Sequence, residues 1–183
     1  MLYATTVTTN DELEQINVLN KKNLKQNISP QEKQHEGFVT WLYSLELLQQ
    51  INELAASVIV KEDDTVVGYA LVTPREAGKF HPDLKTMISN LETLFYHNKL
   101  LNSYSYYIMG QVCIYKEYRR KGIFNMLFQH HKKLYSDKYE LLVTEISAGN
   151  HRSQKAHEKT GFKTIHTYHD AMEEWNVVVW DWT

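Results

Sequence analysis

Three consecutive cationic residues, Arg119, Arg120 and Lys121, stand between an apolar stretch at 111–115 and an amphipathic stretch that begins after Gly122. The pattern predicts a strand, a short basic turn and a helix. The first N–H groups of a helix are unpaired and carry the positive end of the helix dipole, so they attract phosphate. Glycine lets a ligand approach the backbone closely. The turn therefore predicts a site for a phosphate or pyrophosphate group.

Two common phosphate-binding motifs are absent from the sequence. The chain contains no G-x-x-x-x-G-K-[ST], which excludes a P-loop NTPase, and no G-x-G-x-x-G after a strand, which argues against a Rossmann dinucleotide site. It contains instead Arg119-x-x-Gly122-x-Phe124 where the strand gives way to the helix. One further helix and strand along, residues 150–162 read Asn-x-x-Ser-x-x-Ala-His-x-x-x-Gly-Phe. The phosphate ligand must therefore belong to another class of site.

Length and composition limit the class of protein. The chain has 183 residues, of which 43% are hydrophobic, and predicts a single domain over 1–183. A formal net charge of -2 gives no general attraction to nucleic acid, so the basic turn suits a small anionic ligand. The single cysteine, Cys113, excludes an intramolecular disulfide. No signal peptide is visible, and no apolar run approaches the ~20 residues of a membrane helix. We expect a cytoplasmic protein without a membrane segment.

Hydrophobic periodicity predicts an alternation of strands and helices. A capping box at Thr9 opens the first helix, and Gly110 interrupts an aromatic strand, which predicts a bulge. The predicted strands are 2–8, 56–61, 66–73, 103–115, 140–146, 163–168 and 175–182, and later helices are 44–54, 84–100, 124–135 and 152–159. The order predicts an α/β fold with a mixed, mostly antiparallel twisted sheet flanked by helices.

The two motifs together resemble those of the GCN5-related N-acetyltransferase (GNAT) superfamily. The family's acyl-CoA turn reads Arg/Gln-x-x-Gly-x-Gly/Ala after strand residues such as Val112-x-Ile114 and a Glu-Tyr-Arg such as residues 117–119. Its second motif reads Asn-x-x-Ala/Ser and later Gly-Phe, as residues 150–162 do. The order of elements is also similar to the family's over nearly the whole chain. The resemblance implies a GNAT-like fold in which the helix at 84–100 is an addition between the third and fourth strands.

The resemblance implies that the protein transfers an acetyl group from acetyl-CoA directly to a primary amine of a small molecule or a protein. A catalytically silent acyl-CoA-binding or regulatory module on the same fold is the alternative. Two departures from the family pattern favour that alternative. Phe124 stands where Gly or Ala is usual, and His157 stands where the family often has Tyr, the residue proposed to protonate the CoA thiolate.

The resemblance also implies which residues bind the cofactor. The backbone N–H of Ile114 would polarise the thioester carbonyl. Asn150 would bond the pantetheine amide, cap the following helix, or do both. The implied cofactor-binding residues are Val112, Ile114, Arg119, Arg120, Lys121, Gly122, Ile123, Phe124, Asn150, Ser153 and His157.

Acyl transfer also needs a proton acceptor for the amine. Besides Ile114, two catalytic candidates follow. His157 is either an acid for the leaving thiolate or a helix residue that only packs against its neighbours. Glu145 is either a base that faces the cleft or a paired surface residue, and Gln111 and Tyr107 are its neighbours on the bulged strand. A water relay is the remaining choice of base.

Three further expectations concern the rest of the chain. Cys113 alternates with its apolar neighbours and is expected in the core rather than as a nucleophile. No His, Cys and Asp cluster has metal-ligand spacing, so we expect no metal. Near the last hairpin, Asp170, Glu173 and Glu174 either favour a cationic acceptor or form an exposed acidic loop. The strand at 175–182 is a core strand or the edge of a homodimer.

Overall fold

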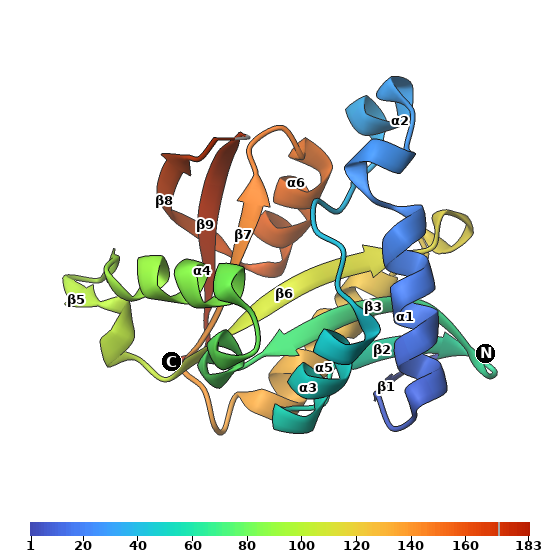
Figure 1. The fold of residues 1–183 in the computed structure, drawn as a ribbon, viewed down its shortest axis with the longest axis horizontal. Helices are drawn as coiled ribbons and strands as arrows, with labels where there is room; N and C mark the ends of the chain where they lie inside the picture. The colour runs from blue at the N-terminus through green and yellow to red at the C-terminus, as the bar shows by residue number, and fades with distance from the viewer. Residues whose placement is uncertain (172) are drawn as a thin grey trace.

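A seven-stranded sheet forms the centre of the molecule, in the order β1-β2-β3-β6-β7-β9-β8 (Figure 1). The computed structural model describes residues 1–171 and 173–183. Only the ladder between β6 and β7 is parallel among the ladders of this sheet, which confirms the mixed, mostly antiparallel prediction. The strands of the sheet are β1 Leu2–Thr6, β2 Val58–Glu62, β3 Thr65–Thr73, β6 Tyr106–Ile114, β7 Leu141–Ser147, β8 Lys163–His169 and β9 Glu174–Asp181.

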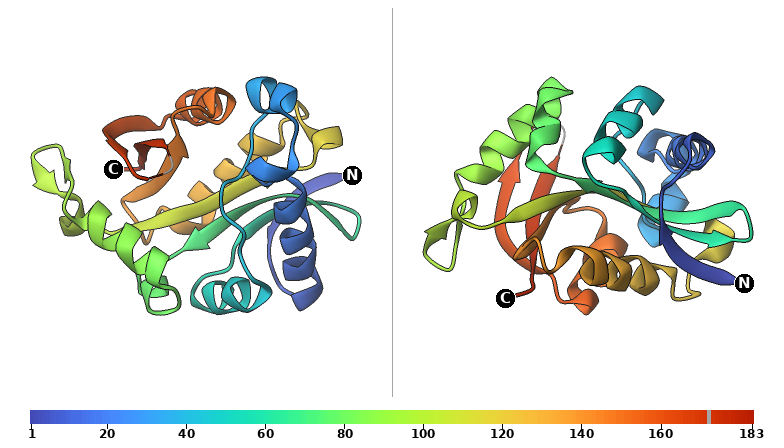
Figure 2. Two further views of the ribbon diagram at one scale, coloured as in Figure 1. Left: turned by 45° about the horizontal axis from the view of Figure 1, so that its top comes forward. Right: turned by 90° about the horizontal axis from the view of Figure 1, so that it is seen from below.

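Helices cover both faces of the sheet (Figure 2). One face carries α1, α3 and α4, and the other carries α5 and α6. The helices are α1 Asn10–Lys22, α2 Pro30–His35, α3 Leu45–Leu54, α4 Pro82–Glu92, α5 Ile123–Tyr135 and α6 His151–Thr160. Because both faces are covered, a central strand can be apolar along its whole length.

Strand β3 has this pattern. Val66, Tyr69 and Leu71 pack beneath α1 and α3. Val67 and Val72, which point the opposite way, pack beneath α5. The two apolar layers lock the sheet between the helices and hold the end of β6 in place beside β3.

The predicted capping box at Thr9 is confirmed. The Thr9 hydroxyl accepts the N–H of Glu12 at 3.2 Å, and the Glu12 carboxylate accepts the N–H of Thr9 at 3.1 Å, so the capping box is formed. Helix α6 ends at Gly161, whose φ of 115° is the left-handed conformation that glycine adopts without strain.

The helix predicted at 84–100 is wrong in its second half. Helix α4 ends at Glu92, and a hairpin of β4, Phe95–Tyr96, and β5, Lys99–Leu100, follows it (Figure 1). His97 and Asn98 take φ values of 45° and 63° between these strands. Two successive positive φ values make a tight hairpin turn, so the apolar spacing that continues from α4 is not helical. Phe95 is 64% exposed and does not face the core.

Strand β6 bulges and then leaves its neighbour β7. Val72 pairs with Met109 and Ala70 with Val112, so Gly110 and the next residue stand opposite a single residue of β3, as the bulge prediction required. The pairing of β6 with β7 covers only Tyr106–Ile108. Beyond that point the two strands separate, and a groove opens between them.

Candidate active site

The basic turn joins the end of β6 to the start of α5. Arg120 and Gly122 both have positive φ values, 66° and 79°, so the backbone curls tightly before the helix. Gly122 is the N-cap of α5 and has no side chain to bond the first N–H groups. The first turn, 123–126, contains no Asp or Glu. A Cβ built on Gly122 would meet no atom within 4 Å, so the helix start is open to a ligand.

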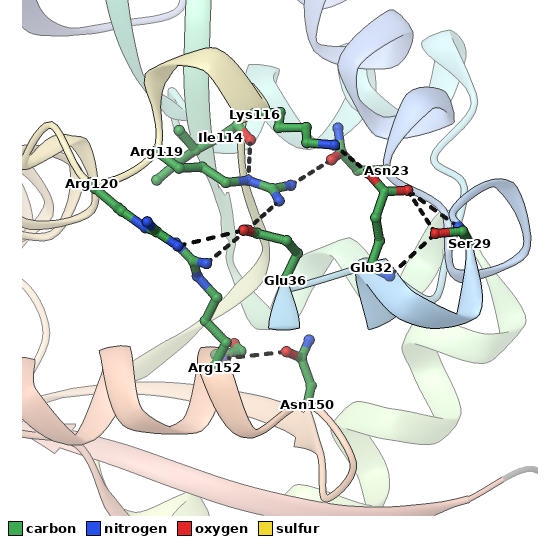
Figure 3. Close-up of polar contacts among 11 residues, drawn as sticks. Asn23, Ser29, Glu32, Glu36, Ile114, Lys116, Arg119, Arg120, Asn150 and Arg152 are labelled. Carbon is green, nitrogen blue, oxygen red and sulfur yellow. Dashed lines mark hydrogen bonds and ion pairs between the residues drawn. The ribbon is translucent and has the colours of Figure 1, made fainter. Parts of the chain in front are cut away.

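A carboxylate lies against this turn in the protein (Figure 3). Glu36 Oε2 is 2.7 Å from Nη1 of Arg119 and 2.7 Å from Nη1 of Arg152. Arg120 Nη2 is 3.9 Å from the other carboxylate oxygen. Burial acts to raise the pKa of Glu36, but the hydrogen bond from Arg119 and the charges of the three arginines outweigh it and hold that pKa below its ordinary value. The site therefore stabilises a half-buried anion.

Beside the turn, a hollow of about 210 Å³ opens between the end of β6 and the start of α6. Most of the cofactor-binding residues named from the sequence line it: Val112, Ile114, Arg119, Arg120, Gly122, Ile123, Phe124, Asn150 and Ser153. Lys121 does not line it, and its Nζ lies 4.6 Å from the centre of the Tyr118 ring. His157 lies deeper, in the next hollow.

The backbone of Ile114 faces the groove. Tyr115 donates its N–H to Val67 O on β3 at 2.9 Å. Successive N–H groups of a strand point to opposite sides, so the N–H of Ile114 points away from β3, toward the side where β7 has separated. Its carbonyl accepts Arg119 Nε at 3.3 Å. This orientation agrees with the role that the resemblance implies for the Ile114 N–H.

Asn150 is the N-cap of α6. Its Oδ1 accepts the N–H of Ser153 at 3.3 Å, so the capping alternative is observed. Its Nδ2 donates to Phe38 O at 3.0 Å. Asn150 thereby holds the segment 36–41, which we call the strap, against the groove.

His157 is a core residue, 1% exposed, among the rings of Phe124, Phe128 and Phe162. Its Nδ1 lies 2.8 Å from Ser153 O, so this nitrogen carries the proton and donates it to the carbonyl. Burial lowers the pKa of His157 to about 4. A neutral ring whose N–H is engaged by a carbonyl has no proton ready for a thiolate, so this placement favours the packing alternative over the acid.

Glu145 lies on β7 with its side chain in the groove. The Tyr168 hydroxyl donates to Glu145 Oε2 at 3.0 Å. Burial raises the pKa of Glu145 to about 7, against an ordinary value of 4.5, and the nearby Asp170 adds to the rise. A carboxyl group with this pKa can take up a proton near neutral pH. Of its two neighbours on β6, Gln111 also lines the groove, but Tyr107 is buried on the opposite face beneath α5.

The groove is continuous from the basic turn to a wide cleft. A second hollow follows the first and shares Phe38, Val112 and Asn150 with it. The wide cleft, of about 400 Å³, comes next and shares Trp41 and Glu145 with the second hollow. Glu145 therefore stands at the point where the narrow part of the groove opens into the cleft.

The acidic residues near the last hairpin have different positions. Asp170 lines the cleft. Glu173 instead pairs with Lys25 at 3.0 Å, and Glu174 pairs with His169 at 3.0 Å. Of the three, Asp170 is the one that lines the cleft, and its carboxylate already accepts the N–H of Glu173 and the Nε1–H of Trp175, each at 2.9 Å.

Three further observations concern Cys113, metal ligands and membrane spans. Cys113 is buried on the face of α1, opposite Val112 and Ile114, and burial raises its pKa to about 12, so the core prediction is confirmed. Within residues 1–171 and 173–183, no group of three or more His, Cys, Asp and Glu side chains is placed to hold a metal ion. In the same part of the chain, no helix combines the length and the apolar character needed to cross a membrane.

Sequence reasoning missed Glu36, Arg152 and the strap. The stretch 20–36 is polar without periodicity, and Glu36 is 83 residues from Arg119, so no local pattern links them. Arg152 stands inside the second motif and could have been noted as a cation two positions after Asn150. From the sequence alone, Phe38 and Trp41 could be assigned only as apolar residues of a loop.

The chain was compared with known proteins. No curated protein was found to match its sequence. A putative acetyltransferase of the GNAT family from Desulfovibrio desulfuricans has a similar solved structure, with a TM-score of 0.66, 12% identity, and coverage of 100% of both chains. Ard1 from Thermoplasma volcanium has a TM-score of 0.66 at 11% identity, with 97% of each chain covered.

Arabidopsis thaliana Naa50, solved in complex with the bisubstrate analogue CoA-Ac-MVNAL, has a TM-score of 0.62 at 15% identity, with 98% of each chain covered. At such identities the likeness concerns the fold. A family profile described as "Acetyltransferase (GNAT) family" matches residues 23–162, which include the basic turn, Glu145 and the second motif. The chain therefore belongs to the GNAT acetyltransferase family.

Proposed function

We propose that the protein transfers the acetyl group of acetyl-CoA directly to a primary amine. The observation that carries this proposal is the continuous groove, which runs from the basic turn, past the N–H of Ile114, to the carboxyl of Glu145 at the mouth of the cleft. One end of the groove suits a pyrophosphate, and the other end suits an amine. Membership of the GNAT family supports the same assignment.

The pyrophosphate of acetyl-CoA would lie at the start of α5, where the free N–H groups of the first turn and Arg119 and Arg152 offer positive charge. It would take the place of the Glu36 carboxylate, which already shows that an anion is stable there. The pantetheine chain would then follow the separation of β6 from β7, past Val112.

The chemical step follows from the order of groups along the groove. The amine nitrogen attacks the thioester carbonyl, and the Ile114 N–H stabilises the negative charge that develops on oxygen. Glu145 accepts the proton that the nitrogen loses as the C–N bond forms. The C–S bond then breaks, and water protonates the CoA thiolate. His157 takes no part in this scheme.

Two measurements test the proposal. In a thermal-shift titration, acetyl-CoA and CoA should raise the melting temperature, whereas ADP and NAD should not. A ligand at ~100 times its dissociation constant adds about 2.7 kcal/mol of stability. Release of free CoA in the presence of a panel of primary amines then measures transfer. Binding without transfer to any amine would identify a silent acyl-CoA-binding module, and no binding of CoA would overturn both assignments.

A further inference from the structure

The wide cleft beyond Glu145 has walls of distinct chemistry. The strap, α4, the middle of β6, β7 and the ends of β8 and β9 enclose about 400 Å³. Its apolar and aromatic lining consists of Trp41, Tyr43, Leu84, Met87, Ile108, Met109, Tyr168 and Trp175. A volume of this size holds a small molecule. The surface is one that excludes water around an apolar group.

The charged residues of the cleft all have the same sign. Asp83, Glu145 and Asp170 line it, and none of the described lining residues is Lys, Arg or His. The hollow at the basic turn has the opposite character, because it is lined by Arg119, Arg120 and Arg152, and the Glu36 carboxylate beside them offsets only one of these three charges. The groove is therefore polarised from a cationic end to an anionic end.

We propose that the acceptor is a small primary amine that carries an aromatic or other apolar body and no carboxylate. This inference rests on the proposed function and specifies its second substrate. The ammonium form is attracted by the carboxylates of Asp83 and Asp170, and by Glu145 when it is ionised. Aromatic walls such as Trp41 and Trp175 suit both a cation and a ring. The apolar body would lie against Met87 and Leu84 of α4.

Free amino acids fit this cleft poorly. Their carboxylate would lose its water beside the carboxylates of Asp83 and Asp170, and none of the described lining residues of the cleft is a cation that could pair with it. A peptide N-terminus would bring further N–H and C=O groups that need partners. Helix α4 lines the cleft with Leu84 and Met87 and also with Asp83, Thr86 and Asn90, so a peptide is included in the test.

The cleft also contains a group that can accept the proton of the bound ammonium ion. An amine arrives as an ammonium ion, which cannot attack a carbonyl until it has lost one proton. Glu145, whose pKa is raised to about 7 by burial, stands at the mouth of the cleft, where it can accept this first proton and release it to water. The carboxylate is then ready to accept the second proton as the C–N bond forms. The Tyr168 hydroxyl holds its carboxylate in place at 3.0 Å. The cleft thus binds the charged amine and prepares it for attack.

The test is a comparison of kcat/KM for matched acceptors at saturating acetyl-CoA. The panel is 2-phenylethylamine, phenylalaninamide, phenylalanine, spermidine and a pentapeptide with an N-terminal methionine. We expect 2-phenylethylamine to exceed phenylalanine and the peptide at least tenfold, mainly through KM, with phenylalaninamide between them. A preference for the peptide, for phenylalanine or for spermidine would overturn the inference and leave the proposed function standing.

Two variants connect the preference to the cleft. Asp83→Lys places a cation at the rim and should reduce the ratio of 2-phenylethylamine to phenylalanine at least threefold. Glu14→Lys makes the same change of charge on the exposed face of α1 and should leave that ratio unchanged. Met87→Ala should raise KM for 2-phenylethylamine and leave KM for spermidine unchanged. An unaltered ratio in Asp83→Lys, with the melting temperature retained, would place the acceptor outside the cleft.

Acetyl-CoA binding is measured on the same samples by calorimetry. If acetyl-CoA binds but none of the five acceptors is acetylated, the proposed function fails and the inference fails with it. If transfer occurs with the wrong class of amine, only the inference fails.

Discussion

The Glu36 carboxylate and the Arg119 guanidinium are 2.7 Å apart at the place where the pyrophosphate of acetyl-CoA is expected. The same carboxylate oxygen is 2.7 Å from Arg152. The strap that begins with Glu36 goes on to line the cleft through Thr40 and Trp41. Binding at one end of the groove is therefore connected, through one segment of chain, to the shape of the other end.

Glu36→Gln should tighten the binding of acetyl-CoA. The variant removes a charge that competes with pyrophosphate for two arginines, and we expect an affinity gain of about fivefold with a steeper dependence on salt, as for a partly buried ion pair. Calorimetry at two ionic strengths measures both. Glu32→Gln is the matched control, because Glu32 lies on the same segment but pairs with Lys116. Weaker binding in Glu36→Gln would mean that Glu36 holds the turn in its binding shape.

Glu145→Gln should remove the acidic limb of the pH–rate profile. Because burial raises the pKa of Glu145 to about 7, the wild-type kcat should rise with pH through about pH 7 as the base becomes deprotonated. The variant should lose about 10²-fold in kcat at pH 8 and keep its affinity for acetyl-CoA. Glu174→Gln, at a carboxylate that contacts His169 outside the groove, is the control. A limb that survives in Glu145→Gln would assign it to another group.

The same carboxyl group should affect stability in a pH-dependent way. Its folded pKa lies above its ordinary value of 4.5, so its contribution is complete below about pH 4.5 and is lost as pH rises through about 7. Glu145→Gln does not titrate. Urea denaturation should therefore show the variant gaining on the wild type between pH 5 and pH 8. Between the ordinary and the folded pKa, the carboxyl group is protonated in the folded protein and ionised in the unfolded chain. In that range the gain is about 1.4 kcal/mol for each unit of pH. A constant difference across this range would contradict the raised pKa.

His157→Phe should leave catalysis nearly unchanged. The ring packs among Phe124, Phe128 and Phe162 and is neutral because its pKa is lowered to about 4 by burial. Phenylalanine keeps an aromatic ring in this cluster but cannot transfer a proton. We expect kcat within about threefold of the wild type, well short of the 10²–10⁴-fold of general acid catalysis. A loss of 10²-fold with unchanged acetyl-CoA affinity would restore the acid role of His157.

Gly110→Ala should destabilise the bulge that shapes the groove. A Cβ at this position would lie 2.6 Å from Thr73 Oγ1 and 2.8 Å from the Tyr43 hydroxyl, both too close for any side chain. We expect a loss of about 1–3 kcal/mol in the free energy of unfolding, the usual cost of overpacking. Gly149→Ala is the control, since its nearest atom is 3.8 Å away. Equal stability of the two variants would show that β6 can yield at Gly110.

The sequence predicted those parts of the site whose residues lie close together along the chain. The basic turn and its Gly122 lie within one strand-to-helix junction, and the pattern of residue types there determines the geometry. The pairing of Glu36 with Arg119 joins segments 83 residues apart, and a polar stretch without periodicity cannot reveal it. The burial of His157 was also hidden, because α6 is polar overall and its environment comes from α5.

The hairpin after α4 shows a second limit. Apolar residues continue at helical spacing up to Phe95, so periodicity alone extended the helix. The turn at His97 and Asn98, two residues with positive φ, ends that pattern. The signal was present in Asn98, a residue that tolerates this conformation, but the apolar spacing outweighed it.

The short parallel ladder has a mechanical consequence. Three residue pairs join β6 to β7, whereas β7 and β9 are joined along seven, so the sheet is two smaller sheets with a narrow seam between them. The groove lies along the continuation of that seam. A ligand that fills it stands where backbone partners are missing and connects the two halves. Cofactor binding should then add to the stability of the folded sheet.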